Sequence, residues 1–227
     1  MRTLFHMPLD PASRMIRIIL AEKGLPAQFV ERRPWADDDG ALGAVNPAVT
    51  VPVLIDEPPT GGEIAISPAS AIVEYLEEAY TSEPLFPATS AARAETRRLC
   101  HWFIDKFETE VSAFTLRERV DKRLMRRGQP DYELLKAGAE ALAWHLDYTA
   151  WLLDQRYWLA GDKMSAADIA AAAQLSALDY IDFVPWEKFS AVKDWYARVK
   201  SRPSMRPILR DRIEGLPPPA HYDNPDF

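Results

Sequence analysis

Residues Leu159–Ala170 read LAGDKMSAADIA, and this stretch predicts where a helix of the C-terminal half begins. Ser165 followed by Asp168 is the pattern of a capping box, in which the hydroxyl accepts a first-turn N–H and the carboxylate accepts the N–H of the cap residue. Met164 and Ile169 stand where a hydrophobic staple would pack. Both features are structural, so the stretch decides the local fold rather than the chemistry.

Helical patterns continue on both sides of it. The segment 131–153 starts at Asp131, a good N-cap after the breaker Gly128-Gln129-Pro130, and repeats leucine on one helical face. That face comprises Leu135, Leu142, Leu146 and Leu153. Other helices are expected over 91–127, 190–200 and 205–212. Residues 91–213 therefore predict an all-helical domain, and the proline-rich residues 214–227 predict an extended tail.

The first 80 residues instead predict mixed α/β structure. Strands are expected over 2–7, 28–31, 51–55 and 63–66, the last two joined by a turn over 58–62. After the first strand, Asp10 is a suitable helix N-cap, Pro11 fits the first turn and Gly24 suits a C-cap. A second helix is expected from Ser67-Pro68 to about Tyr80. Residues 81–90 contain prolines without a clear period, which predicts a linker.

Composition restricts the class of protein. The chain has 227 residues, a formal net charge of −7 and one cysteine, Cys100. This charge argues against bulk attraction to nucleic acid. One cysteine cannot form an internal disulfide and fits a reducing compartment, and its apolar neighbours predict a buried, inert thiol. No apolar run approaches the ~20 residues of a membrane span, and residues 1–6 lack a signal-peptide pattern. We therefore expect a cytoplasmic protein without membrane insertion.

Four motifs, in this order, resemble the glutathione transferase superfamily across nearly the whole chain. They are the opening Leu4–Leu25, the stretch Asn46–Leu54 with its Val51-Pro52 pair, Ser70–Leu76 and Leu159–Ala170. The resemblance implies a thioredoxin-like N-terminal domain followed by a helical C-terminal domain. It also implies a cis peptide between Val51 and Pro52, whose backbone groups pair with glutathione in active members.

The position of the thiol-activating residue departs from the family pattern. Active members place a Ser, Cys or Tyr near the start of the first helix, where it favours the glutathione thiolate. Aligned on Ile16-Arg17, that position falls on Asp10, whose ionised carboxylate would repel a thiolate. We expect Asp10 to be a helix N-cap instead. Ser13 lies nearby on the helix and is the alternative donor.

A second departure concerns the groups that hold the γ-glutamyl carboxylate of glutathione. The family pattern has Glu or Gln followed by Ser, but Pro68 and Ala69 stand there. Neither side chain forms hydrogen bonds, and Ser67 and Ser70 flank the gap in the wrong register. Together with Asp10, these residues predict a vacant glutathione site. The four histidines lack metal-ligand spacing, so we expect no catalytic residue, cofactor or metal.

Three segments are candidates for binding a partner protein instead. Trp35 lies among two arginines and three aspartates, where an indole either anchors an interface or folds back onto its own domain. Residues 117–127 carry six basic and two acidic residues, which suits a solvated helix end or an acidic partner. The aromatic residues of the tail either pack back or grip a partner. The candidate contacts are Trp35, Arg117, Arg119, Arg123, Tyr222, Asp226 and Phe227.

The two ends of the chain sharpen this expectation. MRTLFHMPLDPASR over 1–14 and PPAHY over 218–222 resemble glutathione-transferase-like cell-division proteins of alphaproteobacteria that bind FtsZ, the tubulin-like division polymer. That resemblance implies a non-enzymatic homodimer that binds and curves FtsZ filaments and promotes constriction at the division site. The alternatives are a glutathione-dependent transferase or isomerase, and a carrier that uses a cleft between the domains.

Overall fold

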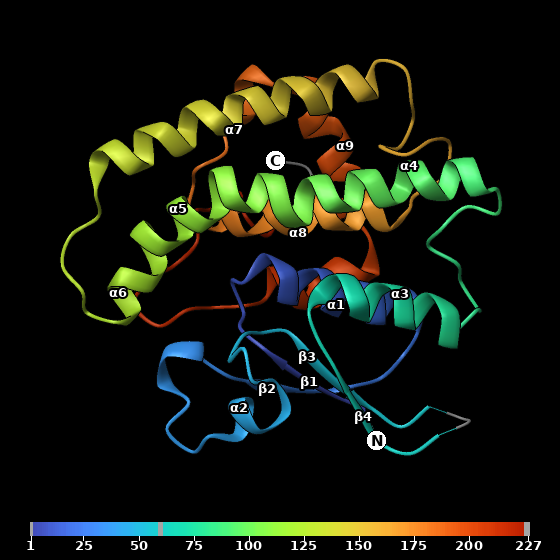
Figure 1. Cartoon of the computed structure of the whole chain (residues 1–227). Helices are drawn as coiled ribbons and strands as arrows, with labels where there is room; N and C mark the ends of the chain where they lie inside the picture. The colour runs from blue at the N-terminus through green and yellow to red at the C-terminus, as the bar shows by residue number, and fades with distance from the viewer. Residues whose placement is uncertain (1, 59–60, 225–227) are drawn as a thin grey trace. The chain divides into compact units, whose positions relative to one another are not determined.

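A four-stranded sheet of order β2-β1-β3-β4 organises the N-terminal part of the chain (Figure 1). Its strands are β1 (Thr3–His6), β2 (Gln28–Glu31), β3 (Val53–Asp56) and β4 (Ile64–Ile66). β1 pairs parallel with β2 and antiparallel with β3, and β3 pairs antiparallel with β4. Each strand lies within two residues of its predicted bounds. The structure describes residues 2–58 and 61–224, so part of the turn expected over 58–62 lies outside the described residues.

Two helices of this part match the sequence pattern, α1 (Pro11–Glu22) and α3 (Ala69–Ala79). The apolar residues of α1 that gave the period, Met15, Ile16, Ile19 and Leu20, are all buried. A short 3₁₀ turn, η1 (Pro34–Ala36), and a short helix, α2 (Ala41–Val45), were not anticipated. α2 has five residues and no side-chain cap, so it presents no measurable helical period.

The contacts divide the chain into two compact units, Met1–Leu85 and Phe86–Phe227. The second unit opens with consecutive helical elements: α4 (Ser90–His101), η2 (Trp102–Ser112), α5 (Ala113–Leu116), η3 (Arg117–Asp121) and α6 (Lys122–Leu124). They cover the long helical stretch expected over 91–127. η2 and η3 are π-helical, which is a local widening that hydrophobic periodicity does not reveal.

Every residue of α8 (Ala166–Tyr180) is buried. The other helical elements that remain are α7 (Tyr132–Leu153), η4 (Trp186–Lys188), α9 (Ser190–Lys200), η5 (Pro203–Met205) and α10 (Arg206–Leu209). α8 packs mainly against α4, η2, α5 and α9. Asp131 caps α7 as expected, accepting from Glu133 and Leu134 N–H at 2.9 and 3.3 Å. In α7, Leu142 and Leu146 are buried, but Leu152 is buried where Leu153 was expected to be.

The capping box at the start of α8 is confirmed. Asp168 Oδ2 accepts from Ser165 N–H at 2.9 Å, and Ser165 Oγ accepts from Ala167 N–H at 3.3 Å. Asp168 does more than the sequence indicated, because its other oxygen accepts from Leu159 N–H and Trp195 Nε1–H at 2.9 and 3.0 Å. This buried carboxylate therefore joins α8, α9 and the loop before α8.

Candidate functional site

The register of the sheet brings three loops to one of its ends. β3 places Val53 opposite Phe5, and β4 places Ile66 opposite Leu54. The chain therefore leaves β1, enters β3 and leaves β4 at the same end of the sheet. The segments after β1, before β3 and after β4 carry the residues assigned to the glutathione-site remnant: Asp10, Ser13, Val51, Pro52, Ser67, Pro68 and Ala69.

Asp10 and Ser13 are both engaged within the first unit. Asp10 Oδ2 accepts from Ser13 N–H at 2.6 Å, which confirms Asp10 as the N-cap of α1. Ser13 Oγ accepts from Met7 N–H at 3.2 Å, and the Ser13 side chain is fully buried. Both side chains therefore accept hydrogen bonds from backbone N–H groups near the start of α1.

The two proline junctions also lie at this end of the sheet. The peptide between Val51 and Pro52 is cis, as the family resemblance implied. The peptide between Ser67 and Pro68 is cis as well, which was not anticipated. Val51 precedes the β1–β3 ladder, whose register starts at Val53, so its backbone lies beyond the sheet.

The start of α3 lacks the side chains that would hold a carboxylate. Pro68 occupies the N-cap position without a side-chain cap, and its carbonyl accepts from Ala71 and Ile72 N–H at 3.0 and 3.1 Å. Ala69, the next residue, is buried. A helix N-terminus attracts anions, but Pro68 and Ala69 add no hydrogen-bonding side chain to it.

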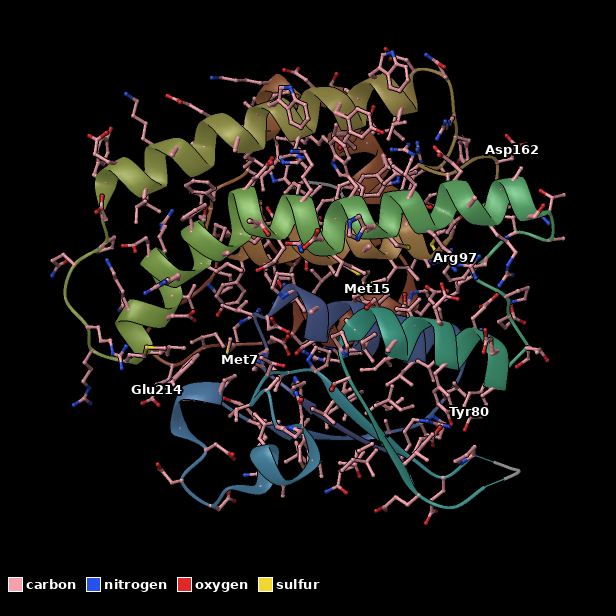
Figure 2. All side chains as sticks on the ribbon, in the orientation of Figure 1. Met7, Met15, Tyr80, Arg97, Asp162 and Glu214 are labelled. Carbon is pink, nitrogen blue, oxygen red and sulfur yellow. The ribbon has the colours of Figure 1, made fainter. Side chains whose placement is uncertain are left out.

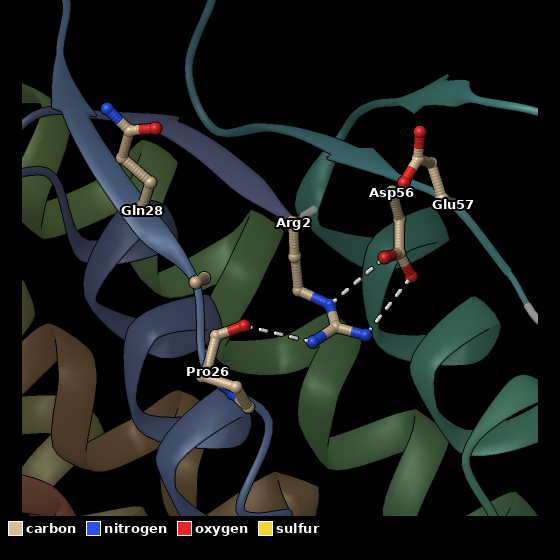
Figure 3. A pocket seen from close by; sticks show the side chains of 6 residues that line it. Arg2, Pro26, Gln28, Asp56 and Glu57 are labelled. Atoms are coloured by element: carbon tan, nitrogen blue, oxygen red, sulfur yellow. Dashed lines mark hydrogen bonds and ion pairs between the residues drawn. The ribbon is translucent and has the colours of Figure 1, made fainter.

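A pocket of about 640 Å³ lies at the opposite end of the same sheet (Figure 3). In its wall Arg2 Nε lies 3.2 Å from Asp56 Oδ1, and Arg2 Nη1 donates to Pro26 O at 3.0 Å. Asp56 also accepts from the Tyr75 and Tyr80 hydroxyls at 2.9 and 2.6 Å. Burial, together with the hydrogen bond to Asp56, raises the pKa of Tyr75. The charges of Arg2 and Asp56 are thus satisfied within the fold and do not mark a ligand site.

The loop around Trp35 is ordered by its own charges. Asp37 accepts from Leu42 and Gly43 N–H, both at 2.9 Å, and these bonds hold the pKa of Asp37 below its usual value. Arg32 pairs with Asp39 at 3.2 Å. Trp35 itself is half-buried, so part of the indole is accessible. The loop is a preformed surface with most of its charge neutralised internally.

The basic helix end, residues 117–127, is only partly available to a partner. Lys122 pairs with buried Glu118, which also accepts from Asp131 N–H at 2.6 Å. These two contacts lower the pKa of Glu118. Arg123 donates to the Gly215 carbonyl. Arg117 and Arg123 are exposed and Arg119 is half-buried, and of the two exposed arginines Arg123 is engaged with Gly215.

The Arg123 contact joins two candidate surfaces that are far apart in sequence. Because Gly215 follows Glu214 in the C-terminal segment, the basic helix end and the beginning of that segment are neighbours (Figure 2, Glu214 labelled). We call residues 117–127 together with 210–216 the basic docking surface. Trp35 belongs to the other unit of the chain.

Tyr222 is a correction to the sequence analysis. Its side chain is fully buried, and its hydroxyl donates to Ile208 O at 3.3 Å, so it packs into the helical unit rather than contacting a partner. The tail is not simply extended, since residues 213–224 include a β-bridge and turns. Removing the chain after Pro219 would therefore cost stability. The candidates Asp226 and Phe227 lie outside the described residues.

An exposed aromatic stack was missed by the sequence analysis. We define it as Trp102, Trp144, Tyr148 and Trp151. Trp102 lies between Trp144, with ring centres 5.6 Å apart, and Tyr148, at 4.4 Å. Tyr148 in turn stacks on Trp151 at 6.0 Å. Trp144 and Trp151 are 51% and 53% exposed. Their spacing of seven residues on α7, opposite the leucine face, was the signal in the sequence.

Polar and charged side chains contact the rings of this stack. Buried His145 accepts from Trp102 Nε1–H at 3.1 Å through Nδ1, and its Nε2 lies 3.0 Å from Glu110. Burial lowers the pKa of His145. The Lys106 ammonium lies 5.2 Å from the centre of the Trp144 ring and pairs with Glu110. His145 is thus a packed residue, as expected.

Residues 2–58 and 61–224 offer neither a metal site nor a membrane-spanning helix. These residues contain no group of three or more His, Cys, Asp or Glu side chains placed to hold a metal ion. Their helices include none with the length and apolar character needed to cross a membrane. Cys100 is buried, as its sequence neighbours suggested.

Comparison with known proteins gives matches over most of the chain. The family model of the glutathione S-transferase N-terminal domain matches residues 4–84, and that of the C-terminal domain matches residues 111–203. FtsZ-localized protein A of Caulobacter vibrioides (strain NA1000 / CB15N) is 49% identical over 226 residues, covering 100% of this chain and 98% of that protein.

Solved structures agree with the family match. FzlA from C. crescentus has a TM-score of 0.95 at 49% identity and covers 100% of this chain and 99% of its own. A glutathione S-transferase from Rhodospirillum rubrum F11 also has a TM-score of 0.95, at 44% identity and with 100% of both chains covered. The thioredoxin-like unit and the helical unit expected from the sequence are therefore both confirmed.

Proposed function

This chain belongs to the glutathione S-transferase family, and we propose that it is a non-enzymatic member that binds FtsZ filaments and promotes constriction at the division site in the cytoplasm. The observation that carries the proposal is the 49% identity, over 100% of this chain, to a protein named FtsZ-localized protein A. Identity of this extent, with a TM-score of 0.95, supports a shared surface as well as a shared fold.

The degenerate glutathione site supports a non-enzymatic role. Asp10 caps α1, Ser13 is buried, and Pro68 and Ala69 replace the residues that would hold the glutathione carboxylate. Activation of a thiol needs a donor beside the sulfur, and these residues supply none. The proposal therefore includes no catalytic residue and no cofactor.

We assign filament binding to the basic docking surface and the Trp35 loop. The chain carries a net charge of −7, so a local group of exposed arginines at 117–127 is an exception that suits an acidic filament. Trp35, half-buried in an ordered loop, supplies an aromatic anchor that loses little entropy on binding. Asp226 and Phe227, which lie outside the described residues, stay candidate contacts.

We further propose a homodimer that buries the exposed aromatic stack. Contiguous exposed aromatic rings mark interaction surfaces. The charges around the stack are paired within the chain, Lys106 with Glu110 and Arg98 with Glu95 at 2.7 Å, so the local charge at this face does not oppose a second copy. A dimer also doubles each filament contact, which strengthens binding to a polymer by avidity.

Light scattering tests the dimer. Replacing Trp144 and Trp151 together by Ser should convert a dimeric mass to a monomeric one. Tyr132→Ser, a change at a side chain that is 75% exposed on the same helix, should leave the mass unchanged. A monomeric parent protein would remove the homodimer from the proposal.

A glutathione-dependent transferase or isomerase is the second candidate. It is favoured by the Rhodospirillum rubrum relative, which is described as a glutathione S-transferase at 44% identity. The cis junction before Pro52 keeps the backbone frame of a glutathione site.

Co-sedimentation with FtsZ polymers decides between the two candidates. The purified chain should pellet with FtsZ polymerised in GTP and stay in the supernatant without FtsZ. A parallel conjugation assay with glutathione and an electrophilic substrate should give no rate above background. Turnover without pelleting would favour the enzyme.

A further inference from the structure

The C-terminal segment 213–224 is fastened to α8 at its start. The Tyr180 hydroxyl accepts from Ile213 N–H at 2.8 Å and donates to Leu216 O at 2.7 Å. One buried phenol thus holds both residues of the Ile213–Leu216 bridge. The Tyr180 side chain therefore holds the turn that contains Gly215.

The same segment is fastened again near its end by Tyr222. Its ring meets that of Tyr180 edge to face, with centres 5.1 Å apart. The Tyr222 side chain is 0% exposed and its hydroxyl donates to Ile208 O at 3.3 Å. Removing a fully buried aromatic ring would leave a cavity and lose these packing contacts. The buried Tyr222 side chain therefore anchors the segment to the helical unit.

His221, the residue before Tyr222, adds a polar contact to the same helical unit. Its Nε2 lies 2.9 Å from Oδ1 of Asp179, a residue of α8 whose side chain is 0% exposed. Lys200 Nζ, also 0% exposed, lies 3.3 Å from Asp179 Oδ2 and donates to the His221 carbonyl at 3.1 Å. Trp186 Nε1–H completes the site by donating to Asp179 at 2.8 Å. His221 therefore contacts two buried charged groups: its ring contacts the Asp179 carboxylate, and its carbonyl accepts from the Lys200 ammonium.

We propose that His221 and Tyr222 are positioning residues, which clamp segment 213–224 so that the basic docking surface is preformed for an acidic filament. This rests on the proposed function. Tyr222 packs against the ring of Tyr180, whose hydroxyl holds the turn at Gly215, and the Gly215 carbonyl accepts from Arg123. The clamp therefore acts on that guanidinium through Tyr180. At the other end, Arg212 pairs with Asp223 at 2.9 Å, which closes the segment on itself. Without the clamp the partner would have to order the segment on binding, at a cost in affinity.

The test compares four variants by hydrogen exchange and by FtsZ pelleting. Tyr222→Ala removes the buried aromatic ring, and His221→Ala removes the contact between the imidazole and Asp179. Tyr222→Phe keeps the ring and loses only the hydroxyl, and Ala220→Ser changes an exposed neighbour. Exchange in peptides covering 213–224 should become roughly tenfold faster in the two alanine variants, while α8 and α9 keep their protection. Filament affinity should fall about three- to tenfold. The Ser variant should match the parent in both measurements, and Tyr222→Phe, which loses one buried hydrogen bond but keeps the ring, should lie between the parent and Tyr222→Ala.

The outcomes separate the clamp from the proposed function. Unchanged exchange in both alanine variants would overturn the clamp. Faster exchange with unchanged filament affinity would overturn the positioning role and leave FtsZ binding in place. If the parent does not pellet, the proposed function and the positioning role fail together, while exchange still decides whether the clamp exists. Should Tyr222→Ala fail to fold, His221→Ala provides the same two measurements.

Discussion

Asp10 uses its carboxylate on the Ser13 amide, and Ser13 uses its hydroxyl on the Met7 amide. At the scale of single residues, these two bonds engage both side chains in the start of α1. At the start of α3, Pro68 occupies the cap position without a hydrogen-bonding side chain, and its carbonyl accepts from Ala71 and Ile72 N–H.

Glutathione should accordingly bind this chain very weakly. Titration calorimetry is expected to show no saturable heat at glutathione concentrations up to about 10 mM, well above the millimolar range of modest affinity. The reason is the loss of both the thiol donor and the carboxylate anchor at Asp10, Pro68 and Ala69. A dissociation constant in the low millimolar range or tighter would contradict a vacant site. Ophthalmic acid, which lacks the thiol, is the matched control ligand.

Asp121 predicts a pH effect on stability. Burial raises its pKa from 3.8 to about 6, against the opposing effect of Arg117. The folded state therefore binds this proton more tightly than the unfolded state, so the contribution of Asp121 to stability falls as pH rises from about 4 to about 6. Asp121→Asn removes the buried charge and should stabilise the protein by about 1 kcal/mol at pH 8, a value reduced for partial exposure.

Urea denaturation at pH 4 and pH 8 measures this effect. The gain from Asp121→Asn should be present at pH 8 and absent at pH 4. Asp105→Asn, at a side chain that is 64% exposed, is the control and should change stability little at either pH. An equal gain at both pH values would mean that the Asp121 carboxyl is not the cause.

At the scale of elements, the capping residue Asp168 of α8 also connects segments that are far apart in the chain. The Ser165–Asp168 pair was predictable because a capping box is a local pattern in the sequence. The additional bonds from Leu159 N–H and Trp195 Nε1–H to Asp168 were not, because they depend on packing between segments far apart in the chain. The burial of Asp168 raises its pKa against the hydrogen bonds that lower it.

The two halves of the capping box should therefore differ in their mutational cost. Ser165→Ala should lower the free energy of unfolding by about 1 kcal/mol, the usual value of a lost N-cap. Asp168→Ala should lower it by about 3 kcal/mol or more, because several buried donors lose their acceptor. Chemical denaturation provides the measurement, with Asp162→Ala in the exposed loop before α8 as control. Equal costs for the two variants would show that the Trp195 and Leu159 bonds add little.

Local signals in the sequence were sufficient for the strands, for α1 and for the start of α7. They did not reveal α2, which is too short for a helical period, or the π-helical stretch η2. The buried position of Tyr222 depends on a pocket formed by α8 and α10, so no window of sequence contains the information. For the aromatic stack, the spacing of Trp144 and Trp151 was visible, but its partner Trp102 comes from another helix.

At the scale of the whole molecule, charge is unevenly distributed. The net charge of −7 would repel an acidic polymer, and exposed Arg117 lies in the basic segment that could reverse this locally. Part of that segment serves the fold, since Lys122 pairs with Glu118 and Arg123 holds Gly215. A charge effect on filament binding should thus depend on position and not on net charge alone.

Charge reversal at Arg117 tests this dependence. Arg117→Glu should weaken FtsZ pelleting roughly two- to tenfold at low salt and should flatten its salt dependence. Lys136→Glu, at an exposed position on α7, changes the net charge equally and should leave pelleting close to that of the parent. If both variants weaken binding equally, the effect is one of net charge and the basic docking surface is wrong.

The aromatic stack makes this protein its own optical probe. Trp102 and Trp144 lie with ring centres 5.6 Å apart and planes inclined by only 23°, so the electronic transitions of the two indoles couple. Near-ultraviolet circular dichroism should carry that coupling as a pair of bands of opposite sign. Any molecule that settles on Trp144 and Trp151 displaces water from their exposed faces and moves their fluorescence to shorter wavelength. Assembly can therefore be followed by light alone, in the unlabelled chain.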